Sequence, residues 1–217
     1  MALETVKICG LSTVGSVQQA VSGGASHLGF IFFPKSPRNV TPEQAASLVA
    51  HAGGRQTVAV TVNADDTFLD AIDRTMQPHI HQLHGAETPQ HVETVKTRYG
   101  KPVMKAMAIR SQDDLTKLKA YDGIADLLLL DAKPPAGSDL PGGNGVTFDW
   151  DLVAGLNTAT PVLLSGGIDL ENLGLAKSLV SDASNSLMGI DVSSGVEAKP
   201  GVKDTVKIQD FLVCCRA

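Results

Sequence analysis

The feature that most constrains the fold of this 217-residue chain is a regular alternation of two kinds of segment. Short apolar or β-branched runs of strand length are separated by longer stretches that have the spacing of amphipathic helices. The expected strands lie at residues 5–9, 28–32, 57–62, 79–83, 102–106, 126–131, 161–164 and 187–192. The expected helices lie at residues 15–22, 42–51, 66–76, 89–98, 112–120, 148–155, 171–179 and 204–213.

Strict alternation of strands and helices predicts an α/β fold in which helical crossovers join the strands of a parallel sheet. Eight such units match a single-domain (β/α)8 TIM barrel that spans residues 1–217. A doubly wound open sheet is the alternative, because both folds bury their strands on two faces. The one long stretch rich in glycine and proline, residues 133–145, is expected to be a functional or disordered loop after the sixth strand.

Composition excludes several classes of partner. The net charge is −5 and aromatic residues make up 4%, so neither general attraction to nucleic acid nor a base-stacking surface is expected. No signal peptide is recognisable, and no apolar run approaches the length of a membrane span. The three cysteines, two of them adjacent near residue 215, do not resemble a disulfide framework. A reduced, cytoplasmic protein with no membrane or nucleic-acid partner is therefore predicted.

Catalytic groups of a barrel lie at the carboxyl ends of its strands. The first strand ends at Cys9, and Lys7 shares its face, where an ammonium would favour the thiolate. The sixth strand ends with four leucines and then Asp131, and an apolar wall favours the protonated carboxyl that a general acid needs. Cys9 is alternatively a small buried hydrophobe, and Asp131 a loop cap or a partner of Lys133.

Two further sets of residues suit an anionic ligand. Arg38 lies in a loop stiffened by two prolines, and its guanidinium matches a planar carboxylate, although a solvated surface arginine is the simpler interpretation. Glycines and serines follow the seventh and eighth strands, where this fold commonly binds phosphate on backbone amides. The phosphate-binding candidates are Gly166, Gly167, Ser193, Ser194 and Gly195.

A histidine-rich strand raises the question of a metal site. His79 and His81 share a face of the expected strand, whereas His84 falls out of phase, and no carboxylate lies nearby in a ligand-like pattern. A metal site usually needs three or more convergent ligands, so no metal is expected. His84, at the end of the strand, is instead a candidate for contact with a substrate.

Short motifs occur in order between residue 6 and about residue 211. They are KICGL (7–11), GF (29–30), PKSPR (34–38), QLHG (82–85), LLD (129–131), GGNG (142–145), FDW (148–150), SGG (165–167), GIDVSSGVE (189–197) and PGVKD (200–204). Their ordered combination resembles the phosphoribosylanthranilate isomerase family. The chain departs from the usual family residues at 12–14, at Asn144 and at Ser165.

The resemblance implies a barrel enzyme of tryptophan biosynthesis that uses no cofactor. Its reaction would be the Amadori rearrangement of N-(5′-phosphoribosyl)anthranilate to 1-(2-carboxyphenylamino)-1-deoxyribulose 5-phosphate. Cys9 then matches the family's general base, Asp131 its general acid and Arg38 its ligand for the anthranilate carboxylate. The other expected contacts of this phosphorylated small molecule are Lys7, His84, Gly143 and Asp191. The expected assembly is a monomer or a homodimer.

Three other functions remain open from the residues alone. A Schiff-base aldolase would use Lys105 or Lys133, and borohydride would trap its lysine adduct. A metal-dependent hydrolase would use the histidine run. A non-catalytic binding barrel has no need for Cys9, Asp131 and both glycine loops together.

Overall fold

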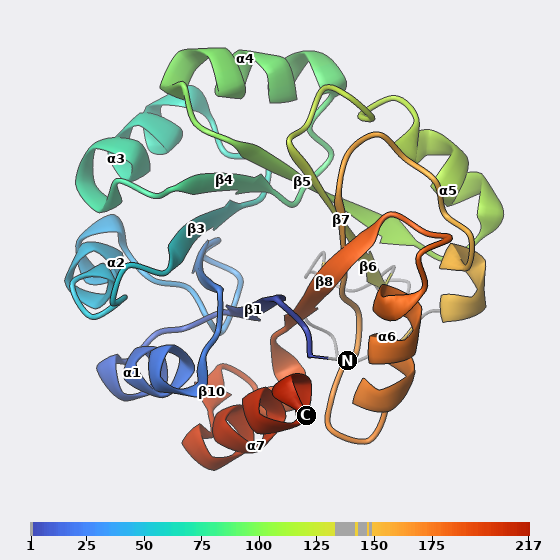
Figure 1. Cartoon of the computed structure of the whole chain (residues 1–217). Helices are drawn as coiled ribbons and strands as arrows, with labels where there is room; N and C mark the ends of the chain where they lie inside the picture. The colour runs from blue at the N-terminus through green and yellow to red at the C-terminus, as the bar shows by residue number, and fades with distance from the viewer. Residues whose placement is uncertain (1, 133–141, 143–146, 148) are drawn as a thin grey trace.

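The computed structural model describes residues 2–132, 142, 147 and 149–217, and its central feature is a closed barrel of eight parallel strands (Figure 1). Each strand pairs with the next, and β8 pairs with β1. The strands are β1 (Thr5–Cys9), β2 (His27–Phe32), β3 (Gln56–Thr61), β4 (Ile80–Leu83), β5 (Val103–Ile109), β6 (Leu127–Ala132), β7 (Val162–Leu164) and β8 (Leu187–Val192). The predicted barrel is confirmed, and the open sheet is wrong.

The helices pack around the outside of the barrel (Figure 1). They are α1 (Val14–Gly23), α2 (Pro42–Val49), α3 (Asp66–Met76), α4 (Pro89–Tyr99), α5 (Gln112–Leu118), α6 (Leu173–Ser181) and α7 (Thr205–Arg216), with short 3-10 helices η1 (Trp150–Val153) and η2 (Ser194–Val196). The α-helix predicted at 148–155 is wrong over its described part, which forms only η1. Asp149 caps that single turn, and Gly155 follows it with a φ of 71° that no helix accommodates.

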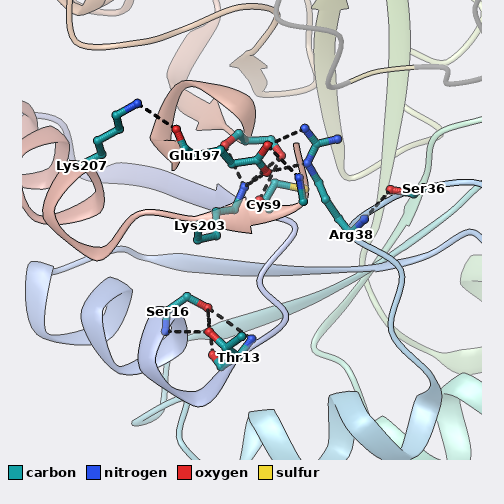
Figure 2. Close-up of polar contacts among 10 residues, drawn as sticks. Cys9, Thr13, Ser16, Ser36, Arg38, Glu197, Lys203 and Lys207 are labelled. Carbon is teal, nitrogen blue, oxygen red and sulfur yellow. Dashed lines mark hydrogen bonds and ion pairs between the residues drawn. The ribbon is translucent and has the colours of Figure 1, made fainter. Parts of the chain in front are cut away.

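The departure from the family pattern at residues 12–14 lies at the start of the first helix. Thr13 caps α1: its side chain accepts a hydrogen bond from the backbone N–H of Ser16, and the Ser16 side chain accepts one from Thr13 (Figure 2). Thr41 and Gln44 form the same reciprocal cap at α2, where Pro42 occupies the first turn. These caps satisfy N–H groups that a helix leaves unpaired at its start.

Alternation along the strands divides the apolar residues into two cores. The larger core lies between the barrel and its helices and includes Ile8 and Leu130. The smaller one fills the barrel interior and consists of Cys9, Val58, Val60, Ile80, Met104, Ala106, Leu129 and Leu163. The faces of β1 and β6 that carry Cys9 and Leu129 therefore point inward.

A short hairpin follows β8 and was not expected from the sequence. It consists of β9 (Glu197–Lys199) and β10 (Val202–Lys203), which pair antiparallel. The chain then enters α7, which packs beside α1 and accepts a hydrogen bond from the backbone N–H of Leu3 at the carbonyl of Cys215, 2.9 Å away. The two ends of the chain thus meet on one side of the barrel (Figure 1). Within the described residues, no helix is long and apolar enough to cross a membrane.

Candidate active site

Polar side chains of β1 and β8 meet inside the barrel. Lys7 is fully buried, and its Nζ donates to Oδ1 of Asp191 at 2.8 Å, while Ser165 donates to the other oxygen of Asp191 at 3.1 Å. Burial lowers the pKa of Lys7, but the charges of Asp191 and Cys9 outweigh it, so the pKa lies above its ordinary value. The predicted contacts Lys7 and Asp191 therefore form a buried ion pair below the end of β1.

Cys9 lies two residues beyond Lys7 on the same inward face. Room for its thiol comes from Gly29 on β2, where a Cβ would be 3.0 Å from Sγ of Cys9 and 3.2 Å from Cε of Lys7. Burial raises the pKa of the Cys9 thiol, and the charges of Lys7 and Lys203 oppose this effect without cancelling it. Lys7 and Lys203 thus favour the ionised thiol, while burial favours the neutral one and has the larger effect.

Asp131 ends the inward face of β6 and is buried. Its Oδ1 accepts the backbone N–H of Ala132 at 2.8 Å, and its Oδ2 lies 3.3 Å from Nε2 of His84. Gly142 lies directly over this pair, because a Cβ there would overlap both side chains. The structure therefore brings Asp131 together with the predicted contact His84.

Gln82 lies on the inward face of β4, two residues before His84. It is fully buried, its Nε2 lies 3.0 Å from Nδ1 of His84, and its Oε1 has no hydrogen-bond partner among the described residues. Gln82 belongs to the QLHG motif but was not predicted to be a site residue. Its position could have identified it, because side chains two residues apart on a strand share a face and Gln82 lies two residues before His84.

Arg38 is buried rather than solvated. Its Nε and Nη2 donate to the two carboxylate oxygens of Glu197, at 2.7 Å and 2.9 Å (Figure 2). Lys203 also donates to Glu197, at 2.8 Å, and binds the backbone carbonyl of Ser193 at 2.8 Å. The Ser193 hydroxyl in turn donates to the backbone carbonyl of Cys9 at 3.1 Å. A continuous set of contacts therefore joins the loop of Arg38 to the end of β1.

Glu197 and Lys203 were missed as functional residues. Both belong to motifs that carried the family resemblance, GIDVSSGVE and PGVKD, so the signal was present in the sequence. Their partners are 159 and 10 residues away along the chain, and no local pattern pairs Glu197 with Arg38. The cluster of two cations and one carboxylate keeps a net positive charge that suits an anionic ligand.

The loops after β7 and β8 lie against each other. A Cβ on Gly195 would overlap the carbonyl oxygen of Ile168, which follows the Gly166–Gly167 turn. Within the described residues, the backbone N–H groups of Gly167 and Ser194 make no hydrogen bond to another part of the protein. The phosphate-binding candidates of both loops are thus brought to one place, with N–H groups available for an anion.

Other candidates lie elsewhere. His81 bonds Asp73 of α3, and His79 bonds Thr57, both away from the barrel interior. Lys105 points outward to Glu87. Among the described residues there is no group of three or more side chains that could hold a metal. Gly143, like Lys133 and Asn144, lies outside the described residues.

Comparison with known proteins identifies the family of the chain. Residues 6–213 match the family model of N-(5′-phosphoribosyl)anthranilate (PRA) isomerase. The N-(5′-phosphoribosyl)anthranilate isomerase of Brucella canis is 53% identical over 212 residues, covering 97% of this chain and 93% of that protein.

The fold is also similar to those of solved phosphoribosylanthranilate isomerase structures. One is of monomers generated from the dimeric phosphoribosylanthranilate isomerase of Thermotoga maritima, with 29% identity, a TM-score of 0.80 and 98% of each chain covered. Another is the isomerase in complex with reduced 1-(o-carboxyphenylamino)-1-deoxyribulose 5-phosphate, with 30% identity, a TM-score of 0.78 and 97% of each chain covered. The chain belongs to the N-(5′-phosphoribosyl)anthranilate isomerase family.

Proposed function

We propose that Cys9 and Asp131 are the base and the acid with which this enzyme of tryptophan biosynthesis isomerises N-(5′-phosphoribosyl)anthranilate to 1-(2-carboxyphenylamino)-1-deoxyribulose 5-phosphate. The observation that carries the proposal is their placement. Cys9 is the last residue of β1 and Asp131 the penultimate residue of β6, and both face the barrel interior at the carboxyl ends of their strands. A substrate held over the barrel mouth would lie between them.

The reaction needs two proton transfers. Protonated Asp131 donates its proton to the furanose ring oxygen as the C1′–O bond breaks, while the anilino nitrogen supplies the electron pair that forms a cationic imine. The Cys9 thiolate then removes the proton from C2′, and the resulting enolamine tautomerises to the ketone. A positioned acid or base contributes about 10²–10⁴-fold each.

The substrate itself helps to ionise the thiol. Burial holds the pKa of Cys9 above its ordinary value in the ligand-free protein. A cationic imine next to C2′ adds a third positive charge to those of Lys7 and Lys203, and nearby cations favour the thiolate. His84, 3.3 Å from Asp131, is placed to return a proton to the acid between turnovers.

The two ends of the substrate carry negative charge. We assign the anthranilate carboxylate to Arg38, whose guanidinium is oriented by two hydrogen bonds to Glu197. The phosphate is assigned to the loops that bear Gly166, Gly167, Ser193, Ser194 and Gly195. Holding both ends fixes C2′ relative to the base, which reduces the entropic part of the barrier. The substrate contacts expected at Lys7, His84, Gly143 and Asp191 remain predictions.

The remaining predictions concern the protein as a whole. Residues 1–217 would act as one catalytic domain in the cytoplasm, without a nucleic-acid or membrane partner and without a cofactor. The assembly would be a monomer or a homodimer, and the relative from Thermotoga maritima is described as dimeric. Gel filtration with light scattering would distinguish the two states.

A fluorescence assay tests the function directly. Purified protein is added to phosphoribosylanthranilate, and the decay of its fluorescence is followed against a Cys9→Ser preparation. Rapid decay with the unmodified chain and slow decay with the variant supports the proposal. Equal decay in both would show that Cys9 is not the base.

A further inference from the structure

We propose that Glu197 is a positioning residue for the isomerisation: it holds the Arg38 guanidinium in the orientation that receives the substrate carboxylate. The inference rests on the proposed role of Arg38 and adds a residue to it. Glu197 touches no reacting atom and would act only through Arg38.

The side chain of Arg38 is fixed at both of its ends. Its aliphatic part lies over Gly10, where φ is +75° and a Cβ would be only 2.6 Å from Cδ of Arg38. Its guanidinium donates hydrogen bonds from Nε and Nη2 to the two carboxylate oxygens of Glu197. Two parallel charge-assisted bonds define the plane of a guanidinium as well as its position. The orientation of the Arg38 guanidinium is therefore set by the Glu197 carboxylate.

Glu197 is itself held in place by the β9–β10 hairpin. Its carboxylate accepts from Lys203 at 2.8 Å and from the backbone N–H of Gly201 at 3.2 Å, and its backbone carbonyl accepts from Lys207 of α7 at 2.8 Å (Figure 2). The side chains of Arg38, Glu197 and Lys203 are each at most 4% exposed. Their geometry is therefore set by the protein before any ligand arrives, as a preorganised site requires.

A purely structural role is the competing explanation, because buried ion pairs are common supports of a fold. The chain offers a matched control. Glu87 and Lys105 form a second buried pair, also 2.8 Å apart and at most 3% exposed, on the outer side of the barrel. Glu87→Gln makes the same chemical change in a pair that does not touch Arg38.

The experiment compares Glu197→Gln with Glu87→Gln. Each variant is assayed for kcat and KM with phosphoribosylanthranilate, and for competitive inhibition by anthranilate and by inorganic phosphate. Losing a charge-assisted bond is expected to raise KM and the inhibition constant of anthranilate about tenfold or more in Glu197→Gln. The value of kcat and the inhibition constant of phosphate should change less than about threefold. Glu87→Gln should alter only the melting temperature.

The outcomes separate the two proposals. If Arg38→Met weakens anthranilate binding and Glu197→Gln does not, the positioning role is overturned and the role of Arg38 survives. If neither variant weakens it, the proposed carboxylate site fails. Should Glu197→Gln not fold, the double variant Glu197→Gln with Lys203→Met removes one charge of each sign and keeps the net charge of the cluster. Unchanged anthranilate inhibition in that variant would also overturn the positioning role.

Discussion

Lys7 and Lys105 are both buried lysines within strands of one barrel, yet their surroundings differ because they face opposite sides of the sheet. Lys7 points inward to Asp191 and Cys9, and its pKa is raised because these groups outweigh burial. Lys105 points outward to Glu87 and to the carbonyls of Leu83 and Gly85, and burial lowers its pKa.

The difference teaches that burial and charge do not by themselves identify a functional lysine. The inner cluster adjoins the strand ends where substrate would bind, whereas the outer cluster ties the loop after β4 to β5. We therefore expect changes on the inner face to alter catalysis and changes on the outer face to alter stability.

Removing the acid or the base should have the largest effect. Cys9→Ser and Asp131→Asn should each lower kcat by about 10²–10⁴-fold, because each removes one proton transfer. The melting temperature should change little, since both replacements have nearly the same size. Steady-state kinetics and thermal unfolding check the two parts, and near-native turnover of either variant would remove its assigned role.

Lys105→Met should break the outer pair without affecting the chemistry. The change leaves the buried Glu87 carboxylate without its cation, and such losses destabilise proteins by about 3–5 kcal/mol. Chemical denaturation measures the free energy of unfolding, and the fluorescence assay measures turnover of the folded fraction. A large fall in kcat would place Lys105 in the reaction, as a Schiff-base mechanism requires, and borohydride trapping would then reveal an adduct.

Arg38→Met should act on binding. Without the guanidinium, the substrate carboxylate loses its charge-assisted partner, and KM should rise about tenfold or more with a smaller change in kcat. Competitive inhibition by anthranilate, measured alongside inhibition by phosphate, shows which end of the substrate is affected. An unchanged KM would mean that the carboxylate is bound by another group.

The smallest effect is expected at His27, the register partner of Lys7 on β2. Burial and then the charge of Lys7 lower the pKa of His27 from 6.5 to about 4. The unfolded chain therefore binds a proton below pH 6.5 that the folded protein does not bind, so stability falls as the pH decreases from 6.5 to 4.

His27→Asn should remove this part of the pH dependence of the free energy of unfolding. We expect this part to amount to about 1–2 kcal/mol, because the ring is partly exposed. Unfolding curves at several pH values measure it. In the same experiments, Lys7→Met should raise the pKa of His27, while Lys105→Met should leave it unchanged. An identical pH dependence in His27→Asn and the unmodified chain would contradict the assignment.

Local periodicity predicted the alternating strands and helices, and the number of such units favoured the barrel over the open sheet. Cys9 and Asp131 were candidates because of their positions at strand ends, and the family resemblance supplied their expected roles. The β9–β10 hairpin was not predicted. The ion pair of Glu197 with Arg38 could not be predicted, since it joins two segments that meet only in the closed barrel. The outward direction of the Lys105 side chain could not be predicted either, because periodicity does not say which face of a buried strand points inward.

The proposed mechanism requires the Cys9 thiolate to act as the base, and one comparison of pH dependences tests this. The rate of Cys9 alkylation by iodoacetamide and the value of kcat/KM are measured from pH 7 to pH 10. Because burial raises the pKa of Cys9, both quantities should increase together as the pH rises across this range. A value of kcat/KM that stays constant while the alkylation rate increases would contradict the account.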